Sequence, residues 1–287
     1  MKHTWGILMC TLLISAGAHA QKVEAYGLFT GKGKKTTFEK MARDAARAQV
    51  VLFGEYHDDP IAHWMQLKLA QDLHQRGNLV MGAEMFERDT QHLLDAYLAG
   101  ELEDKEFRDT VHSIWSNYAT DYKPLVDFAR EQNIPFVATN VPRYMASAVY
   151  RGGFEKLEEL SDEEKEWLPP LPPPYDASLP GYQAMLEMGM GHGGDNFPKA
   201  QAIKDATMGW FIVQNLPDEG IFLHFNGSYH SNNYEGIYWY LNQYASDLRI
   251  FTITTVRQED VSRLDPESRG LADYILVVDE DMTRTYR

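Results

Sequence analysis

The sequence predicts an α/β fold in which helices flank a mainly parallel central sheet, with an irregular insertion rich in Pro, Met and Gly. Three observations lead to this prediction. Short apolar runs rich in β-branched residues alternate with helical stretches, which is the pattern of successive βαβ units. The first four runs contain few polar residues, as expected of strands buried on both faces. Residues 151–197 break the alternation and predict the insertion.

The expected elements follow from local signals along the chain. Residues 60–76, for example, carry apolar side chains at helical spacing from Ile61 to Leu73, and Gly77 ends the pattern. The expected strands are residues 50–54, 79–83, 135–139, 221–225, 250–254 and 274–278. The expected helices are residues 60–76, 89–98, 105–115, 123–132, 198–215 and 234–244.

The insertion combines three unlike pieces. An acidic helix is expected over residues 155–167, a proline run follows at 169–174, and a Met- and Gly-rich stretch covers 185–194. Proline cannot occupy a helix interior or a central strand, so the run predicts irregular backbone. Long loops in compact domains are often functional, so we interpret the insertion as a lid or an interaction surface. The alternative is a surface loop without chemistry.

Composition and the first residues suggest an exported globular protein. The chain has 287 residues, 44% of them hydrophobic and 24% charged, with a net charge of −15. This excludes a disordered chain and argues against nucleic acid, whose binding needs a basic surface. Residues 1–20 resemble a signal peptide, with a basic start, an apolar run over 5–14 and a cleavage motif ending at Ala20. Cys10 follows Met9 rather than a small residue, so no lipid anchor is expected.

Cleavage near Ala20 would leave a single soluble domain over residues 21–287, without cysteine or a transmembrane segment. We expect this domain in the bacterial periplasm. Without cysteine, thiolate catalysis, iron–sulfur clusters and cysteine zinc sites are excluded.

Candidate chemistry gathers where the predicted strands end. In open α/β sheets, ligands bind beyond the carboxyl ends of the strands, and the N-termini of the packed helices lie at the same edge. Four strand ends and one helix start bring ionisable, hydroxyl and amide side chains to this edge. These residues are Glu55, His57, Asp58, Glu84, Glu87, Arg88, Asn140, Arg143, Tyr229 and His230, with Tyr122 at the start of helix 123–132.

Two of these histidines, His57 and His230, sit in a Gly-x-x-His frame at a strand end. A third copy, 189–192, falls in the insertion and is interpreted as an accident. A histidine beside carboxylates can bind a divalent metal, act as an acid–base pair or hold a polar ligand group. The expected metal set is His57, Glu84, Glu87 and His230. The alternative is that the two Gly-x-x-His frames are turns that end the strands and have no chemical role.

The other histidines have simpler explanations. His63, His74, His92 and His112 fall on expected helices and are interpreted as surface or half-buried residues.

Six motifs in order over most of the chain resemble the ChaN family, the haem-binding uptake branch of the Tiki superfamily. The sequence lacks the lipobox of lipoprotein members, and its segment 231–236 is more polar than the usual run. The motifs are Gly54-Glu55-Tyr56-His57-Asp58, residues 82–88 with Gln91 and Tyr97, Tyr122-Lys123-Pro124-Leu125-Val126, Asn140-Val141-Pro142-Arg143, Ala200-Gln201 with residues 204–208, and Gly227-Ser228-Tyr229-His230.

The resemblance implies a mixed α/β fold and haem binding in bacterial iron acquisition. Ferric haem is commonly held by Tyr or His, and a guanidinium forks onto a propionate carboxylate. We expect Tyr122 as the axial ligand, with Tyr229 and Tyr182 behind it, and Arg143 on a propionate. His57 and His230 would bind iron or anchor propionates. A homodimer partner or a haem transporter is the expected protein partner.

Two other functions fit the sequence. Related Tiki-type proteins include metal-dependent hydrolases, so Glu55, His57, Glu84 and His230 could ligate a divalent ion such as Zn or Mn or activate water. An interaction protein would instead use the proline-rich insertion as its partner surface and need no cofactor.

Overall fold

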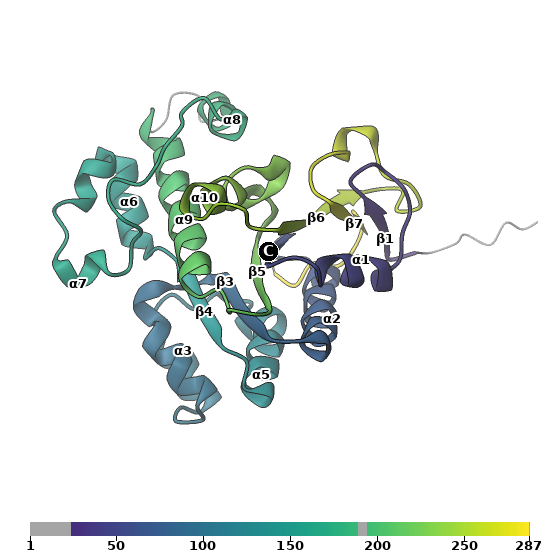
Figure 1. The fold of residues 1–287 in the computed structure, drawn as a ribbon, viewed down its shortest axis with the longest axis horizontal. Coiled ribbons are helices and arrows are strands. Elements are labelled where there is room, and N and C mark those ends of the chain that lie inside the picture. Colours follow the sequence, from purple (N-terminus) through teal and green to yellow (C-terminus); the bar gives the residue numbers. More distant parts are fainter. Residues whose placement is uncertain (1–23, 189–193, 287) are drawn as a thin grey trace, which may run out of the picture.

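The computed structural model describes residues 24–188 and 194–286. The expected signal peptide, Cys10 and the third Gly-x-x-His copy lie outside the described residues. Among the described residues the strands form one sheet in the order β1-β7-β6-β2-β5-β3-β4 (Figure 1). The strands are β1 (Tyr26–Thr30), β2 (Val50–Glu55), β3 (Leu79–Glu87), β4 (Phe136–Asn140), β5 (Ile221–Gly227), β6 (Ile250–Gln258) and β7 (Tyr274–Asp279).

The expected α/β fold is confirmed. Strands β2 to β7 pair in parallel, and β1 alone pairs antiparallel, with β7. All six expected strands form. The sequence reading missed β1, an edge strand in which Gly27 weakens the strand pattern.

Helices cover both faces of the sheet because side chains alternate along each strand. Val51 and Phe53 of β2 join the core cluster of one face, whereas Val50 and Leu52 join that of the other. Figure 1 shows α2, α3 and α5 on one side and α9 and α10 on the opposite side. The first set is α1 (Phe38–Ala45), α2 (Pro60–Arg76), α3 (Gln91–Leu98), α4 (Asp104–Thr110) and α5 (Lys123–Gln132), and the second is α9 (Asn196–Gln214) and α10 (Ile237–Tyr244).

Helix α2 begins directly after its N-cap residue, Asp59. The Oδ1 atom of Asp59 accepts hydrogen bonds from the backbone N–H groups of Ile61 and Ala62, at 3.0 Å each, and Pro60 occupies the first turn. The expected helix 60–76 forms with the expected bounds, as does the expected helix 123–132. The expected helix 105–115 ends earlier, because Val111 is extended after α4.

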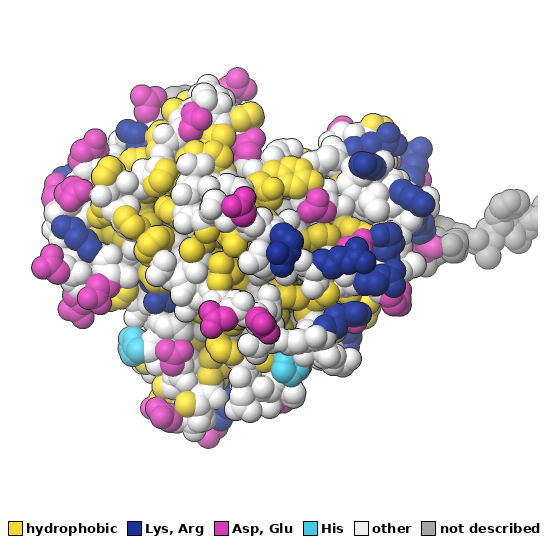
Figure 2. All heavy atoms as spheres, viewed as in Figure 1, with side chains coloured by type: hydrophobic (Ala, Val, Ile, Leu, Met, Phe, Trp, Pro, Cys, Tyr) yellow, Lys and Arg dark blue, Asp and Glu magenta, His cyan; other side chains and the backbone are white. Residues whose placement is uncertain are grey.

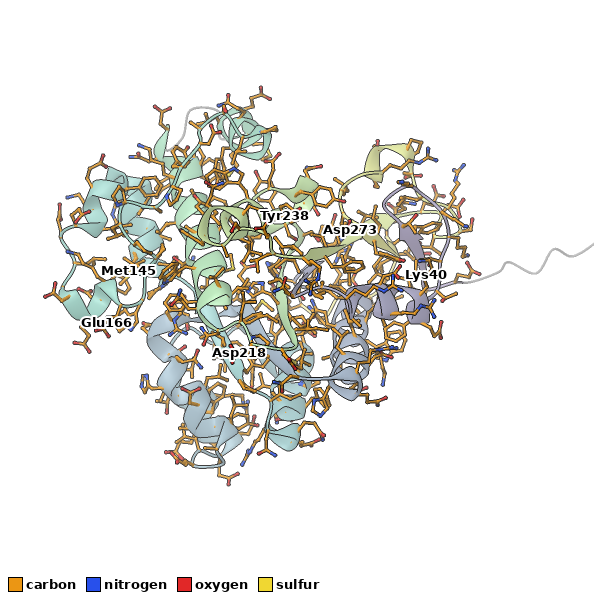
Figure 3. The ribbon with its side chains drawn as sticks, in the orientation of Figure 1. Lys40, Met145, Glu166, Asp218, Tyr238 and Asp273 are labelled. Atoms are coloured by element: carbon orange, nitrogen blue, oxygen red, sulfur yellow. The ribbon has the colours of Figure 1, made fainter. Side chains whose placement is uncertain are left out.

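The segment 151–197 is more ordered than expected. After α6 (Arg143–Gly152), which the sequence reading missed, the expected acidic helix divides into a 3₁₀ turn (Phe154–Leu157) and α7 (Asp162–Lys165), because Ser161 starts α7 with a capping box. The proline run is neither helix nor strand, and α8 (Pro180–Met188) follows it. Leu157 and Leu168 pack with Met145 of α6, labelled in Figure 3, and with Ile203 of α9.

Surface charge is uneven despite the acidic total. Figure 2 shows Lys and Arg side chains gathered over the end of the molecule that carries β1 and α1. The exposed cations of this stretch are Lys32, Lys34, Lys35, Lys40, Arg43 and Arg47. Among the described residues, no helix combines the length and the apolar character needed to cross a membrane.

Candidate functional site

A crevice opens between β2 and β5 at their carboxyl ends. The two strands are parallel neighbours, and Glu55 pairs in register with Gly227. The chain leaves β2 towards α2 on one face of the sheet and leaves β5 towards α10 on the other face. Such a switch point is where open α/β sheets bind ligands. The expected convergence of strand-end residues therefore occurs here.

Glu55 is the hub of a buried hydrogen-bond network. Its Oε1 atom accepts a hydrogen bond from the Tyr122 hydroxyl at 2.8 Å and lies 3.0 Å from Nδ1 of His57. Its Oε2 atom accepts from Nε2 of Gln66 at 2.6 Å and lies 3.2 Å from Nε2 of His63. Four side chains from three different segments thus fix one carboxylate at the crevice.

His63 carries positive charge into this network. Its Nδ1 atom lies 3.5 Å from a carboxylate oxygen of Asp121. Burial alone would lower the pKa of His63, but the charges of Glu55 and Asp121 raise that pKa to about 10. Burial would likewise raise the pKa of Glu55, but His63 and His57 lower it to about 2. The result is a buried ion pair beneath the crevice.

Tyr122 belongs to this network and not to an open cavity. Its side chain is 1% exposed, and burial followed by the Glu55 charge raises its pKa far above the usual range. The π-helical turn Tyr118–Tyr122 places the phenol against Glu55 and the neighbouring Asp121 against His63. Tyr122 thus positions the carboxylate of Glu55, whereas the sequence analysis predicted Tyr122 as the iron ligand.

His57 presents one ring nitrogen to the crevice. Because a carboxylate only accepts hydrogen bonds, Nδ1 of His57 donates to Glu55, and the neutral ring then carries its lone pair on Nε2. The ring is 30% exposed and packs edge-on against Trp115, with ring centroids 4.7 Å apart. Burial lowers the pKa of His57, but its hydrogen bond to Glu55 and the nearby Glu84 charge raise that pKa overall. A histidine held in this way is the usual arrangement of a metal-ligating imidazole.

His230 is arranged differently, because both of its ring nitrogens face carboxylates. Nε2 lies 3.1 Å from Oε1 of Glu84, and Nδ1 lies 2.5 Å from Oδ1 of Asp205. Burial alone would lower the pKa of His230, but the charges of Glu84 and Asp205 raise it to about 10. The other oxygen of Glu84 accepts the backbone N–H of Gly227 at 2.7 Å. His230 therefore holds the carboxylates of Glu84 and Asp205 in place and has no ring nitrogen free to bind a ligand.

Two adjoining cavities open around these clusters. The first, of about 1210 Å³, is lined by Tyr56, His57, Gly227, Tyr229, His230 and Arg257, with residues 280–284 and Tyr286 forming one wall. The second, of about 840 Å³, is lined by Glu84, Glu87, His112, Trp115, Asn140 and Arg143. Tyr286 lines both cavities. The His57–Trp115 ring contact also joins them, since each ring lines a different cavity.

The remaining expected site residues divide between these spaces. Tyr229 lines the first cavity and is 46% exposed, but its hydroxyl donates to the Gly181 carbonyl at 2.9 Å. Tyr182 is buried against α9 and α10 and lines neither cavity. Arg143 lies in the second cavity, exposed at the start of α6.

The expected metal set is also divided. Glu84 contacts His230, whereas Glu87 lies near His112, 3.8 Å from its Nε2 atom. Within residues 24–188 and 194–286, the ligand atoms of His57, Glu84, Glu87 and His230 do not form one close group.

Several site residues were not expected from the sequence. His63 and Gln66 lie one helical turn apart on the sheet-facing side of α2. Their three-residue spacing is the feature of the sequence that places two polar side chains on one helix face. Asp205 was part of a recognised motif but had no assigned role. Asn117 donates to the backbone carbonyl of His57 at 2.8 Å, and Arg257 lies over the Tyr56 ring at 4.3 Å from its centroid.

Comparisons with known proteins agree with this fold. The family model described as haem-binding uptake, Tiki superfamily, ChaN matches residues 41–241. The structure of ChaN of Campylobacter jejuni, solved with cofacial haem binding, has a TM-score of 0.65 and 18% identity, covering 88% of this chain and 97% of that one. An erythromycin esterase mutant in its open conformation has a TM-score of 0.45 and 12% identity, covering 84% and 78% of the two chains, too low to support a shared activity.

A curated relative is 24% identical over 206 residues, the RETICULATA-RELATED 5 protein of Arabidopsis thaliana chloroplasts. The match covers 66% of this chain but only 27% of the relative, so this chain spans about a quarter of that protein's length. The family match covers well over half of the sequence and includes the strand ends that form the crevice. The chain therefore belongs to the haem-binding uptake family ChaN of the Tiki superfamily.

Proposed function

We propose that this chain binds haem in the first cavity, as an exported periplasmic protein of haem uptake that passes haem to a partner subunit or a transporter. The observation that carries the proposal is the free Nε2 atom of His57, held in a cavity of about 1210 Å³ by a buried carboxylate. Haem supplies an iron that takes an axial nitrogen or oxygen ligand. Family membership supports the same ligand class.

His57 is the proposed iron ligand. Its Nδ1–H group is engaged with Glu55, which fixes both the tautomer and the ring orientation. Tyr122, Tyr182 and His230 are less suited, because each is buried and the two nitrogens of His230 face carboxylates. Tyr229 remains the alternative ligand, once its hydroxyl leaves the Gly181 carbonyl.

Arg143 is the proposed propionate partner. Its side chain lies in the second cavity, and no carboxylate of the described residues lies within 4.0 Å of its guanidinium. A ring bound next to His57 would extend past Tyr286, which lines both cavities, so that a propionate reaches Arg143. A guanidinium forks onto a carboxylate with two parallel hydrogen bonds.

The test is a haemin titration of the purified protein, followed in the Soret region with bound metal measured on the same sample. We expect saturation near one haem per chain. His57→Gln should shift the Soret band and weaken binding at least about tenfold, a loss of the size seen for changed metal sites. Arg143→Ala should weaken binding without moving the band.

The control variant is His74→Gln, which changes a histidine in the last turn of α2 that packs against Phe128, and it should bind like the wild type. A Soret shift in Tyr122→Phe or Tyr229→Phe with none in His57→Gln would overturn the ligand assignment. Absence of saturable haem binding would overturn the function.

A metal-dependent hydrolase remains a second candidate because of one observation. His57 and Glu84 both lie beside Gly227: a Cβ atom built on Gly227 would lie 2.9 Å from Nε2 of His57 and 3.5 Å from Oε2 of Glu84. His57 and Glu84 would hold a divalent ion there, or would polarise a water molecule directly, and a bound ion would activate water for hydrolysis. Glu55 and His230 would hold these two side chains in place. This candidate predicts stoichiometric metal and hydrolysis that is lost in Glu84→Gln, with no Soret band.

A further inference from the structure

A second cluster of ligand-type side chains lies at the end of β3. Glu87 is the last residue of β3, Asp89 lies in the 3₁₀ turn that follows (Arg88–Thr90), and His112 lies in the segment after α4. One atom from each of the three falls within 4.8 Å of the others. Among residues 24–188 and 194–286 this is the one group of three His, Cys, Asp or Glu residues to do so.

The distances from His112 to the two carboxylates are close to those of a tetrahedral metal site, and the two carboxylates offer oxygens within 4.8 Å of each other. Nε2 of His112 lies 3.4 Å from Oδ2 of Asp89 and 3.8 Å from Oε2 of Glu87. Zinc binds His nitrogen and carboxylate oxygen at about 2.0–2.2 Å, which places two ligands of a tetrahedron about 3.4 Å apart. The ligand atoms are thus close to the required separation without rearrangement of the backbone.

The two carboxylates accept backbone hydrogen bonds, Glu87 from Arg143 and Asp89 from its own residue, but neither is paired with a Lys or Arg side chain of the described residues. The side chains of Glu87 and Asp89 are only 14% and 13% exposed. Oδ1 of Asp89 is buried and has no hydrogen-bond partner. In the described part of the chain, no Lys or Arg lies within 4.0 Å of either carboxylate, and His112 is the one basic side chain that does. Two such carboxylates repel each other, and a divalent cation between them would offset that cost.

We propose that Glu87, Asp89 and His112 bind a divalent transition-metal ion of the zinc class, with water in the fourth position. A mixed set of imidazole and carboxylate donors suits zinc better than magnesium or calcium, which prefer oxygen alone. This site is separate from the crevice histidines and does not depend on haem binding.

The metal would also steady the wall of the haem cavity. The segment that begins with Val111 and His112 continues to Trp115 and Asn117. Trp115 packs against the His57 ring, and Asn117 donates to the His57 carbonyl. An ion that ties His112 to the end of β3 would therefore restrain the residues that hold His57.

The test is a calorimetric titration of the haem-free protein with ZnCl₂ after removal of metals by chelator, with bound zinc measured after dialysis. We expect one zinc ion per chain. His112→Ala and Asp89→Asn should each lower the affinity at least tenfold. His112 is mostly exposed, so His112→Ala should keep the far-UV circular dichroism and unfolding midpoint of the wild type.

Two controls separate this site from the others. His74→Gln changes a histidine in the last turn of α2 and should leave zinc affinity unchanged, whereas His57→Gln reports whether zinc binds in the crevice instead. No bound zinc, or equal affinity in His112→Ala, would overturn the proposal. Loss of zinc in His57→Gln with retention in His112→Ala would also overturn it and place the ion in the crevice, whatever the outcome of the haem titration.

Discussion

Gly227 leaves the space that the His57 imidazole occupies. A Cβ atom on Gly227 would lie 2.9 Å from Nε2 and 3.1 Å from Cε1 of His57, closer than side-chain atoms normally approach. The backbone of Gly227 has φ −58° and ψ 140°, which any residue adopts. The glycine is therefore required by the position of the imidazole and not by backbone strain.

Gly227→Ala should separate site geometry from folding. The added methyl group would push the His57 ring away from the crevice, so haemin affinity should fall at least about tenfold and the Soret band should shift. Because the clash is with the end of a half-exposed side chain, the unfolding midpoint should change little. Haemin titration and thermal unfolding of the same sample measure both effects.

Gly77→Ala is the matched control, since a Cβ atom there would meet no atom within 4 Å. It should bind haemin as the wild type does. Wild-type haemin binding in Gly227→Ala would show that the His57 nitrogen is not used.

Glu55→Gln should strongly destabilise the fold. It leaves the buried His63 imidazolium without its main counter-charge and removes the acceptor that orients His57. Breaking a buried ion pair from one side costs about 3–5 kcal/mol in the free energy of unfolding. Urea unfolding followed by circular dichroism measures this loss. Glu101→Gln, at an exposed position, should change the same free energy by no more than about 0.5 kcal/mol, and an equal effect in both variants would contradict the buried pair.

Stability should peak near pH 6.5. Charges from Glu55 and Asp121 outweigh burial and raise the pKa of His63 from 6.5 to about 10 in the folded state, so the stabilisation that His63 contributes is complete below pH 6.5 and is lost as the pH rises towards 10. His224 is the opposite case: burial lowers its pKa from 6.5 to about 4, so its contribution is lost as the pH falls from 6.5 to 4. Glu55, with a pKa of about 2 against an ordinary 4.5, adds to the acid loss below pH 4.5.

The free energy of unfolding in urea, measured from pH 4 to pH 10, tests these signs. His63→Gln should reduce the alkaline loss, of which His230 supplies the rest because its pKa is also raised to about 10. It should also lessen the loss below pH 4.5, because the His63 charge lowers the pKa of Glu55. His224→Asn should flatten the acid side and leave the alkaline side. An alkaline loss of stability that persists unchanged in His63→Gln would rule out the Glu55–His63 pair as its cause.

The sheet was predictable because its strands are apolar runs, and the parallel order brings their ends to one edge. That is why Glu55, His57, Glu84 and His230 were expected together from chain order alone, and they do meet around Gly227. Strand β1 was missed because Gly27 interrupts its short apolar pattern.

The roles of individual side chains were harder to predict. Tyr122 starts a helix at the expected edge, but only the packing of the π-helical turn decides that its hydroxyl meets Glu55 and not the cavity. Asp89 and His112 are separated by 22 intervening residues, and no sequence spacing indicates that a turn and a loop bring them within 3.4 Å. Such contacts depend on tertiary structure that local patterns do not encode.

Two hydrogen bonds of Thr285 hold the last described residues against the crevice. Its hydroxyl donates to Oδ2 of Asp121 at 2.6 Å, and its backbone N–H donates to the carbonyl of Asp58 at 3.0 Å. The neighbouring Tyr286 lines both cavities, so this segment forms a wall that the two cavities share. Thr285→Val removes the hydroxyl bond while it preserves shape.

We expect Thr285→Val to raise the haemin association rate in stopped-flow measurements several-fold and to leave the Soret position unchanged, because the iron ligand is untouched. Hydrogen exchange over residues 280–286 should become faster in the haem-free protein. Thr283→Val is the control, since Thr283 lines the first cavity and its hydroxyl makes no hydrogen bond within the described chain. Equal association rates in the two variants would mean that the bond to Asp121 does not restrain this wall, because of these two threonines Thr285 alone bonds to that carboxylate.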